Sequence, residues 1–271
     1  MSGVTLELSG KTDPGCVRDR NEDSMALAPD IGLLVVADGM GGHNAGEVAS
    51  SLATGTILES ARKEFSSGEE PPQDGGGGSP AMRRLDRCIQ AANAVIFERA
   101  QAVAKQHGMG TTVVAILASE GSVAVGHVGD SRLYLWRGGT LQALTEDHSL
   151  VMDQVRHGLI TREQAEKSSF HNILTRALGT EESVRVDMAE HPVVPGDILL
   201  LCSDGLTKML KDDAIAQVLA GAPSPDAAVE TLVAEARRLG GLDNVTVAIA
   251  KVAADRGGWL RRLARMVKRG R

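Results

Sequence analysis

The stretch Gly32-Leu-Leu-Val-Val-Ala-Asp38-Gly-Met-Gly-Gly42 places an apolar run between a glycine and an Asp-Gly pair. The apolar part, within residues 31–37, is too short for a typical helix, and its lack of polar positions predicts a strand buried on both faces. An aspartate directly after such a strand lies at the edge of a sheet, where it can reach other chain segments.

Three more aspartates flank similar apolar runs. Asp130 follows residues 123–129, Asp204 follows residues 198–203, and Asp243 directly precedes residues 244–249. In antiparallel sheets, the end of one strand lies beside the start of its neighbour, so all four carboxylates can share one edge. Such carboxylates repel one another unless a cation neutralises them, and oxygen ligands without a His or Cys cluster favour Mg²⁺ or Mn²⁺. The alternative is that aspartate is simply common where strands meet turns.

The remaining periodicity predicts an α+β fold. Helical spacing covers 45–65 and 80–106, a capping box at Thr161–Gln164 starts a short helix, and two helices lie between residues 203 and 243. The other predicted strands span 4–8, 111–118, 122–128, 132–136, 140–144, 183–190, 197–202 and 244–252. This order predicts stacked antiparallel sheets flanked by helices.

Composition narrows the functional class. The chain has 271 residues and a formal charge of −6; residues 256–271 carry seven positive charges and no acid, which leaves −13 on residues 1–255. An acidic body with only six aromatic residues gives no reason to expect nucleic acid as a partner. We expect one catalytic domain over 1–255, interrupted by a low-complexity loop at 66–79, because no linker separates a second domain.

Cysteine usage and the N-terminus indicate the compartment. Cys16, Cys88 and Cys202 are odd in number, far apart and in no CxxC pair. This pattern argues against a zinc site or a disulfide framework, and the first residues lack the features of a signal peptide. We therefore expect a cytoplasmic protein.

The segment Thr12-Asp-Pro-Gly-Cys-Val-Arg18-Asp-Arg-Asn-Glu22-Asp23 combines an arginine with two carboxylates. A guanidinium matches a phosphate group bidentately, so beside a metal site this segment would act as a phosphate clamp. By itself the segment is better described as a polar loop.

These segments, in this order and spacing, resemble the metal-dependent type 2C protein phosphatases, and the bacterial branch in particular. The resemblance covers roughly residues 5–252 and is carried by the segments Arg18–Asp23, Val36–Gly42, Gly129–Arg132, Leu174–Gly179, Ser203–Gly205 and Asp243–Asn244. It implies a four-layer α-β-β-α sandwich. It also implies a protein serine/threonine phosphatase in which a water activated by two metal ions hydrolyses phosphoserine and phosphothreonine.

The resemblance also implies the site residues. Asp38 would bridge two Mg²⁺ or Mn²⁺ ions, one of them also bound by the Gly39 carbonyl. The other ion would use Asp204 and Asp243, supported directly or through water by the Glu22–Asp23 pair. Arg18 would hold the substrate phosphate. Asp130 would share a third, weaker metal with Asp204, so the expected metal residues are Glu22, Asp23, Asp38, Gly39, Asp130, Asp204 and Asp243.

The proton donor to the leaving serine oxygen departs from the family pattern. Animal members carry a histidine directly after the Asp-Gly pair, where this chain has Met40, which cannot donate a proton. His43 is a candidate catalytic substitute, as is a metal-bound water; alternatively, His43 caps the helix that begins near Ala45. His148 is expected to orient backbone at a helix start. The family's flap corresponds to about residues 151–170.

Partners follow from the same resemblance. Phosphorylated proteins would be the substrates, among them a bacterial-type Ser/Thr kinase and its targets, and a monomer is expected. Residues 256–271 form a basic amphipathic tail, typical of contact with an anionic membrane surface or an acidic partner, or of a solvated terminus. Two other classes are a two-metal esterase of nucleic acids or small phosphate esters, which would need a basic groove, and a binding module without catalysis, which would lack metal carboxylates.

Overall fold

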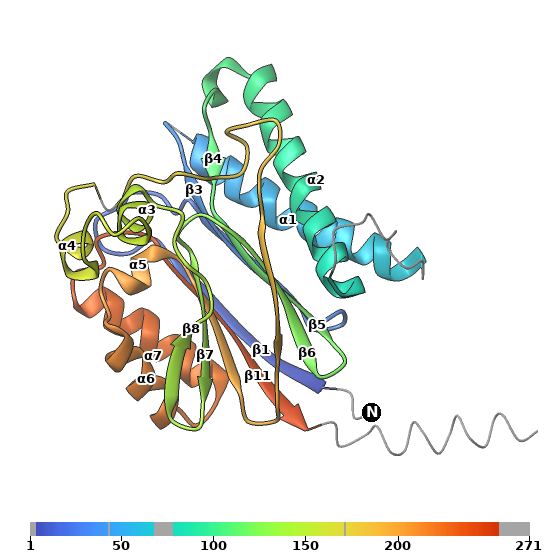
Figure 1. Ribbon diagram of the computed structural model, residues 1–271, viewed down its shortest axis with the longest axis vertical. Helices are drawn as coiled ribbons and strands as arrows, with labels where there is room; N and C mark the ends of the chain where they lie inside the picture. Colours follow the sequence, from blue (N-terminus) through green and yellow to red (C-terminus); the bar gives the residue numbers. More distant parts are fainter. Residues whose placement is uncertain (1–3, 43, 68–77, 171, 255–271) are drawn as a thin grey trace, which may run out of the picture.

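The computed structural model describes residues 4–42, 44–67, 78–170 and 172–254. Two antiparallel sheets stack face to face in the middle of the molecule, and helices cover both outer faces (Figure 1). One outer layer contains α1 (Ala45–Ser67) and α2 (Pro80–Ala102). The other contains α6 (Asp212–Gly221) and α7 (Pro225–Arg238). The predicted α-β-β-α sandwich is therefore confirmed.

Each sheet is formed by strands from several parts of the chain. The first has the order β1-β11-β10-β7-β8, with bounds Val4–Asp13, Val245–Ala254, Ile198–Cys202, Arg132–Arg137 and Thr140–Ala143. The second has the order β2-β3-β5-β6-β9, with bounds Asp23–Ala28, Leu33–Met40, Val113–Ser119, Ser122–Val128 and Asp187–Pro192. The short β4 (Gly110–Thr111) pairs with the end of β3.

The four layers follow from alternation along buried strands. In β3, Leu34 and Val36 pack between the sheets, whereas Leu33 and Val35 pack against the α1 and α2 layer. In β10, Leu199 and Leu201 point inward, and Leu200 and Cys202 face the other helical layer. Because successive side chains point to opposite faces, a continuous apolar run is what a strand covered on both faces requires.

Local signals set where the helices begin. The Ser79 hydroxyl accepts a hydrogen bond from the Met82 amide, and Pro80 occupies the first helical position of α2. Ser224 and Pro225 start α7 in the same way. In the predicted flap, α3 (Leu150–Arg156) is followed by α4 (Arg162–Glu166), whose predicted capping box is present.

The remaining elements are short. A 3₁₀ turn, η1 (Ala104–Gln106), follows α2, and α5 (Asp204–Thr207) directly follows β10. In Figure 1, α3, α4 and α5 lie at the end of the sheets opposite to the start of β1. Among the described residues, no helix is both long and apolar enough to cross a membrane.

Several boundaries differ from the sequence prediction. No strand was predicted over residues 24–28 of β2, whose interior positions are only partly buried and show no clear alternation. β1 runs to Asp13 rather than Leu8, since its polar second half pairs in register with β11. Residues 183–186 lie outside β9, which starts at Asp187, and α5 makes a third helix where two were predicted.

Replacing Leu34 by alanine tests the inter-sheet layer. Leu34 is fully buried among side chains of both sheets, so the truncation should lower the free energy of unfolding by about 2–5 kcal/mol. Urea unfolding followed by circular dichroism measures the change. Leu159→Ala, at a side chain that is 73% exposed, is the matched control and should shift stability by less than about 0.5 kcal/mol. Equal effects would contradict the assigned layer.

Candidate metal and phosphate site

The predicted aspartates meet at one end of the two sheets. Asp38 lies near the end of β3, two residues before its last residue, Met40. The register places Asp23 of β2 directly opposite Asp38. Asp130 follows β6, which runs parallel to β3 because both pair antiparallel with β5. Asp204 follows β10 and Asp243 precedes its antiparallel neighbour β11. The topology therefore brings both sheets' carboxylates to a shared edge.

Burial leaves some of these oxygens without partners. Asp23 Oδ2 accepts hydrogen bonds from the hydroxyls of Ser203 and Thr246, each at 2.7 Å. Its Oδ1 is buried, as is Oδ1 of Asp204, and neither has a hydrogen-bond partner in the described part of the chain. A buried acceptor without a partner is costly, and a cation is the group that satisfies several carboxylate oxygens together.

The pKa values of the clustered carboxyl groups also indicate that a cation is needed. Burial, and then repulsion from Asp23, Asp204, Asp130 and Asp243, raise the pKa of Asp38 well above its usual value. Burial also raises the pKa of Asp23 to about 6 and that of Asp130 to about 7, and it raises that of Asp204. Clustered carboxyls whose charge is this unfavourable form a site suited to a divalent ion.

Glu22 and the Gly39 carbonyl share one side of this site. The Gly39 amide donates to the Glu22 carbonyl at 3.0 Å, and a β-carbon on Gly39 would lie 2.0 Å from the Gly46 carbonyl oxygen. A β-carbon on Gly46 would lie 2.8 Å from both Glu22 Oε1 and the Gly39 carbonyl oxygen. Glycine at both positions is therefore a steric requirement, and it lets a carboxylate and a carbonyl oxygen approach each other.

Two basic side chains contact Asp243. Arg18 Nε lies 2.9 Å from Asp243 Oδ1, and the Arg18 side chain is 54% exposed at the rim of the site. Lys208 Nζ lies 3.0 Å from Asp243 Oδ2 and 2.5 Å from Asp204 Oδ2. Burial raises the pKa of Asp243, but the hydrogen bond and charge of Lys208, together with Arg18, more than offset it and hold that pKa below its usual value.

Several residues that position the carboxylates were not recognised from the sequence. The Asp38 amide donates to Thr112 Oγ1 at 3.0 Å, and Thr112 bonds Ser131, beside Asp130. Asn244 Oδ1 accepts from the Glu22 amide at 2.8 Å. Ser131 and Asn244 stand next to predicted ligands in the quoted motifs, but nothing in the sequence indicates that Ser131 contacts the Thr112 side chain or that Asn244 contacts the Glu22 backbone.

A second cluster of potential ligands consists of His127, His148 and Asp187, whose ligand atoms lie within 4.8 Å of one another. These atoms already have partners. His148 Nδ1 accepts from the Gly129 amide at 3.1 Å, so its other nitrogen carries the proton and donates to Asp187 Oδ2 at 3.2 Å. Burial lowers the pKa of His148 to about 4, which keeps the ring neutral.

His148 therefore orients the turn that carries Asp130, rather than the helix that follows. Its amide also donates to the Gly129 carbonyl, and its carbonyl accepts from Thr175, beyond the flap. Arg176 Nη1 contacts Asp187 Oδ1 at 2.6 Å. These bonds connect the flap's end to the turn before Asp130, so the predicted role in orienting backbone is located at a different segment.

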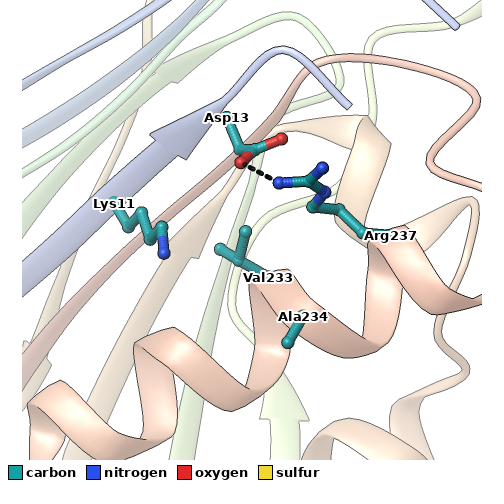
Figure 2. Close-up of a pocket in the computed structure, with 5 residues that line it drawn as sticks. All are labelled: Lys11, Asp13, Val233, Ala234 and Arg237. Carbon is teal, nitrogen blue, oxygen red and sulfur yellow. Dashed lines mark hydrogen bonds and ion pairs between the residues drawn. The ribbon is translucent and has the colours of Figure 1, made fainter. Parts of the chain in front are cut away.

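A pocket on the other side of the first sheet is separate from the carboxylates. It lies between β1 and α7 and is lined by Lys11, Asp13, Val233, Ala234 and Arg237 (Figure 2). Arg237 pairs with Asp13 at 2.9 Å, and Lys11 pairs with Glu230 at 2.5 Å. Both cations are thus already neutralised, and the pocket contains none of the predicted metal residues.

Three of the predicted features lie wholly or partly outside the residues that the structure describes. His43, the candidate proton donor, lies outside the described residues, and so does the basic tail at 256–271. Of the low-complexity loop at 66–79, residues 68–77 are likewise outside the described part of the chain.

Comparison with known proteins identifies the family. The family described as "Protein phosphatase 2C" matches residues 18–235. The chain belongs to the protein phosphatase 2C family. The serine/threonine phosphatase stp of Listeria monocytogenes is 38% identical over 247 residues, covering 89% of this chain and 94% of the relative.

Solved structures of phosphatase 2C relatives agree in fold. The Mycobacterium tuberculosis serine/threonine phosphatase PstP/Ppp has a TM-score of 0.82 at 36% identity, covering 92% of this chain and 99% of that one. The PstP catalytic domain in complex with two manganese ions has a TM-score of 0.79 over the same shares, also at 36% identity. The protein is accordingly a metal-dependent serine/threonine protein phosphatase of the bacterial phosphatase 2C type.

The raised carboxyl pKa values predict the pH dependence of the metal-free protein. Between about pH 4, where these groups ionise in the unfolded chain, and pH 7, Asp23, Asp38 and Asp130 hold more protons in the folded protein than in the unfolded chain. Together they outweigh His148, whose lowered pKa acts in the opposite direction. Stability in EDTA should therefore fall as pH rises through this range. Thermal unfolding at several pH values measures this, and Mn²⁺ should diminish the fall.

Asp130→Asn is the matched variant for this measurement. The amide cannot ionise, so the variant should melt a few degrees higher than wild type in EDTA at pH 7.5 and show a shallower pH dependence. A wild-type melting temperature in EDTA that rises from pH 5 to pH 7.5 would show that the carboxylates do not repel one another as the structure indicates.

Proposed function

We propose that the clustered carboxylates form the two-metal centre of this phosphatase. Asp38, Asp204, Asp243, Glu22 and the Gly39 carbonyl would hold two divalent ions, with Asp204 and Asp243 on one side. Glu22, which the resemblance placed with Asp204 and Asp243, would instead join the Gly39 carbonyl, since both oxygens approach the same position of Gly46. The observation that carries the proposal is a pair of buried oxygens, Oδ1 of Asp23 and Oδ1 of Asp204, that have no partner among the described residues and lie in a group of mutually repelling aspartates. Such an oxygen-only donor set suits Mg²⁺ or Mn²⁺.

Asp23 has a supporting role on the Asp204 side of the centre. Ser203 precedes Asp204, and Thr246 follows Asp243 by three residues, and both hydroxyls bind Asp23 Oδ2. Asp23 therefore aligns the two segments that supply the second ion's ligands, while its free Oδ1 is available to an ion directly or through water. Asp130 is buried, and repulsion from Asp204 contributes to its raised pKa. We therefore place it close enough to share a third ion with Asp204.

Bound divalent ions would supply Lewis acidity toward the phosphoryl oxygens and lower the pKa of the attacking water. The chain's own contribution is positioning and charge. Arg18, at the exposed rim, can exchange its contact with Asp243 for a bidentate contact to the substrate phosphate. Its guanidinium would then stabilise the charge on the equatorial oxygens as the bond to the serine or threonine oxygen breaks.

A group in the site must also donate a proton to the leaving serine or threonine oxygen. Met40 cannot donate a proton, and His43 or a water of the metal centre takes this role. A variant His43→Gln that retained full kcat would assign the role to water.

We infer that the substrates are phosphoserine and phosphothreonine proteins, among them a bacterial-type Ser/Thr kinase and its targets. The catalytic domain is assigned to residues 1–255, acting as a monomer, with the flap at about 151–170 beside the site. The three cysteines are free thiols, which supports a reducing, cytoplasmic compartment.

Hydrolysis of a phosphothreonine peptide tests the proposed centre. Wild type should release phosphate with Mn²⁺ and lose this activity in EDTA, and Asp38→Asn should lower kcat by more than about a hundredfold, because the bridging charge is lost. Malachite green detection of phosphate measures both. The proposal would be abandoned if folded Asp38→Asn kept wild-type kcat, or if wild type released phosphate equally well in EDTA.

Arg18→Lys tests the phosphate clamp. A lysine keeps the charge but cannot form the two-pronged contact, so KM for the peptide should rise by about tenfold with the melting temperature nearly unchanged. Arg20→Lys, two residues along the same segment, is the control, because Arg20 contacts Asn44. An equal rise in KM for both variants would argue against a specific role for Arg18.

A further inference from the structure

Lys208 places a positive charge inside the proposed metal centre. Its ammonium contacts Oδ2 of Asp204 at 2.5 Å and Oδ2 of Asp243 at 3.0 Å, and its side chain is only 25% exposed. It thereby links the two carboxylates assigned to one of the ions, although they are 39 residues apart in the chain.

Local structure explains this position. Asp204 is the first residue of α5, whose C-terminal cap is Lys208, so the two side chains lie four residues apart on one face of the turn. The Lys208 amide donates to the Asp204 carbonyl at 2.8 Å, which completes that turn. Asp243 is oriented by the Asn244 amide, which donates to its Oδ1 at 3.0 Å. The ammonium therefore contacts the opposite oxygen, Oδ2.

An ion bound by Asp204 and Asp243 competes with the ammonium for the negative charge of these two carboxylates, because Lys208 already holds Oδ2 of both. A monovalent ammonium and a divalent ion within a few ångströms of each other also repel strongly in a half-buried site. Ion binding therefore requires Lys208 to leave these carboxylates, and the free energy of the two lost ion pairs is subtracted from the affinity for the ion.

We propose that Lys208 is an internal competitor for the divalent ion at Asp204 and Asp243. The ammonium neutralises the two carboxylates when the ion is absent, and it weakens ion binding because it must be displaced. This inference rests on the proposed two-metal centre. It adds a residue that sets the metal affinity of this particular chain and that makes the metal-free fold more stable than the carboxylates alone would permit.

Manganese binding by full-length variants tests the proposal. Protein stripped with EDTA and dialysed would be titrated with MnCl₂ by isothermal calorimetry at constant pH and ionic strength. Lys208→Met keeps the aliphatic stem and removes the charge. The dissociation constant of the Mn²⁺ ion assigned to Asp204 and Asp243 should therefore fall by about tenfold. Lys208→Arg keeps a cation and should stay within about threefold of wild type.

Thermal unfolding provides a second readout and a control. In EDTA, Lys208→Met should melt at a lower temperature than wild type, and the increase produced by saturating Mn²⁺ should be larger. Lys11→Met is the matched control, because it removes a lysine that pairs with Glu230 of α7 rather than with the clustered carboxylates. It should leave the Mn²⁺ dissociation constant unchanged. If Lys208→Met does not fold, Lys208→Gln replaces it.

An unchanged or higher Mn²⁺ dissociation constant in folded Lys208→Met would overturn the proposal, because a displaced competitor can only weaken binding. A separate measurement shows whether the proposed two-metal site exists. If wild type and Asp38→Asn both bind no Mn²⁺, the assignment of the two-metal site is wrong and the role of Lys208 falls with it.

Discussion

Repulsion among carboxylates held at the shared end of two sheets is the constraint on which the rest of this structure depends. Asp23 and Asp38 lie directly opposite each other on neighbouring strands, an arrangement of like charges that destabilises a sheet. Apolar contacts must therefore hold the strands in register against the local electrostatics. Three apolar clusters provide this: one between the sheets, and one between each sheet and its helices.

The layers require buried apolar side chains and the site requires clustered carboxylates, and the same strands supply both. Along β3 the alternation of Leu33, Leu34 and Val35 fixes which face meets which layer, and this register determines where Asp38 emerges. A slip of one residue would exchange the two faces and move the carboxylate away from its partners. The position of the carboxylates in the proposed metal centre is thus a consequence of core packing.

Two basic side chains reduce the repulsion among the carboxylates and so stabilise the folded protein. Functional carboxylates are unfavourable for the fold until a cation arrives, which is the usual relation between an active site and the stability of its scaffold. Arg18 and Lys208 moderate this conflict from opposite sides of Asp243. The Arg18 side chain is 54% exposed, whereas that of Lys208 is 25% exposed and lies in the position where we propose that it competes with an ion.

Hydrogen bonds between distant segments complete the arrangement. Asp23 is held by hydroxyls that lie 180 and 223 residues away in the sequence. The turn before Asp130 is held by His148, which is in turn bonded to Asp187 at the start of β9. The flap is connected to this turn through Arg176 and Thr175, so its position and that of Asp130 depend on each other.

The sequence by itself determined the family, the four-layer class and most strands, because apolar runs, helix caps and Asp-Gly motifs are local signals. It did not reveal β2, whose weak alternation resembles a loop, or the true start of β9. Only the tertiary structure decided which oxygens remain without partners, that His148 serves the turn before Asp130, and that Lys208 sits between Asp204 and Asp243. These facts depend on contacts between segments far apart in the chain, where distance, burial and charge combine, and no local pattern of residues encodes them.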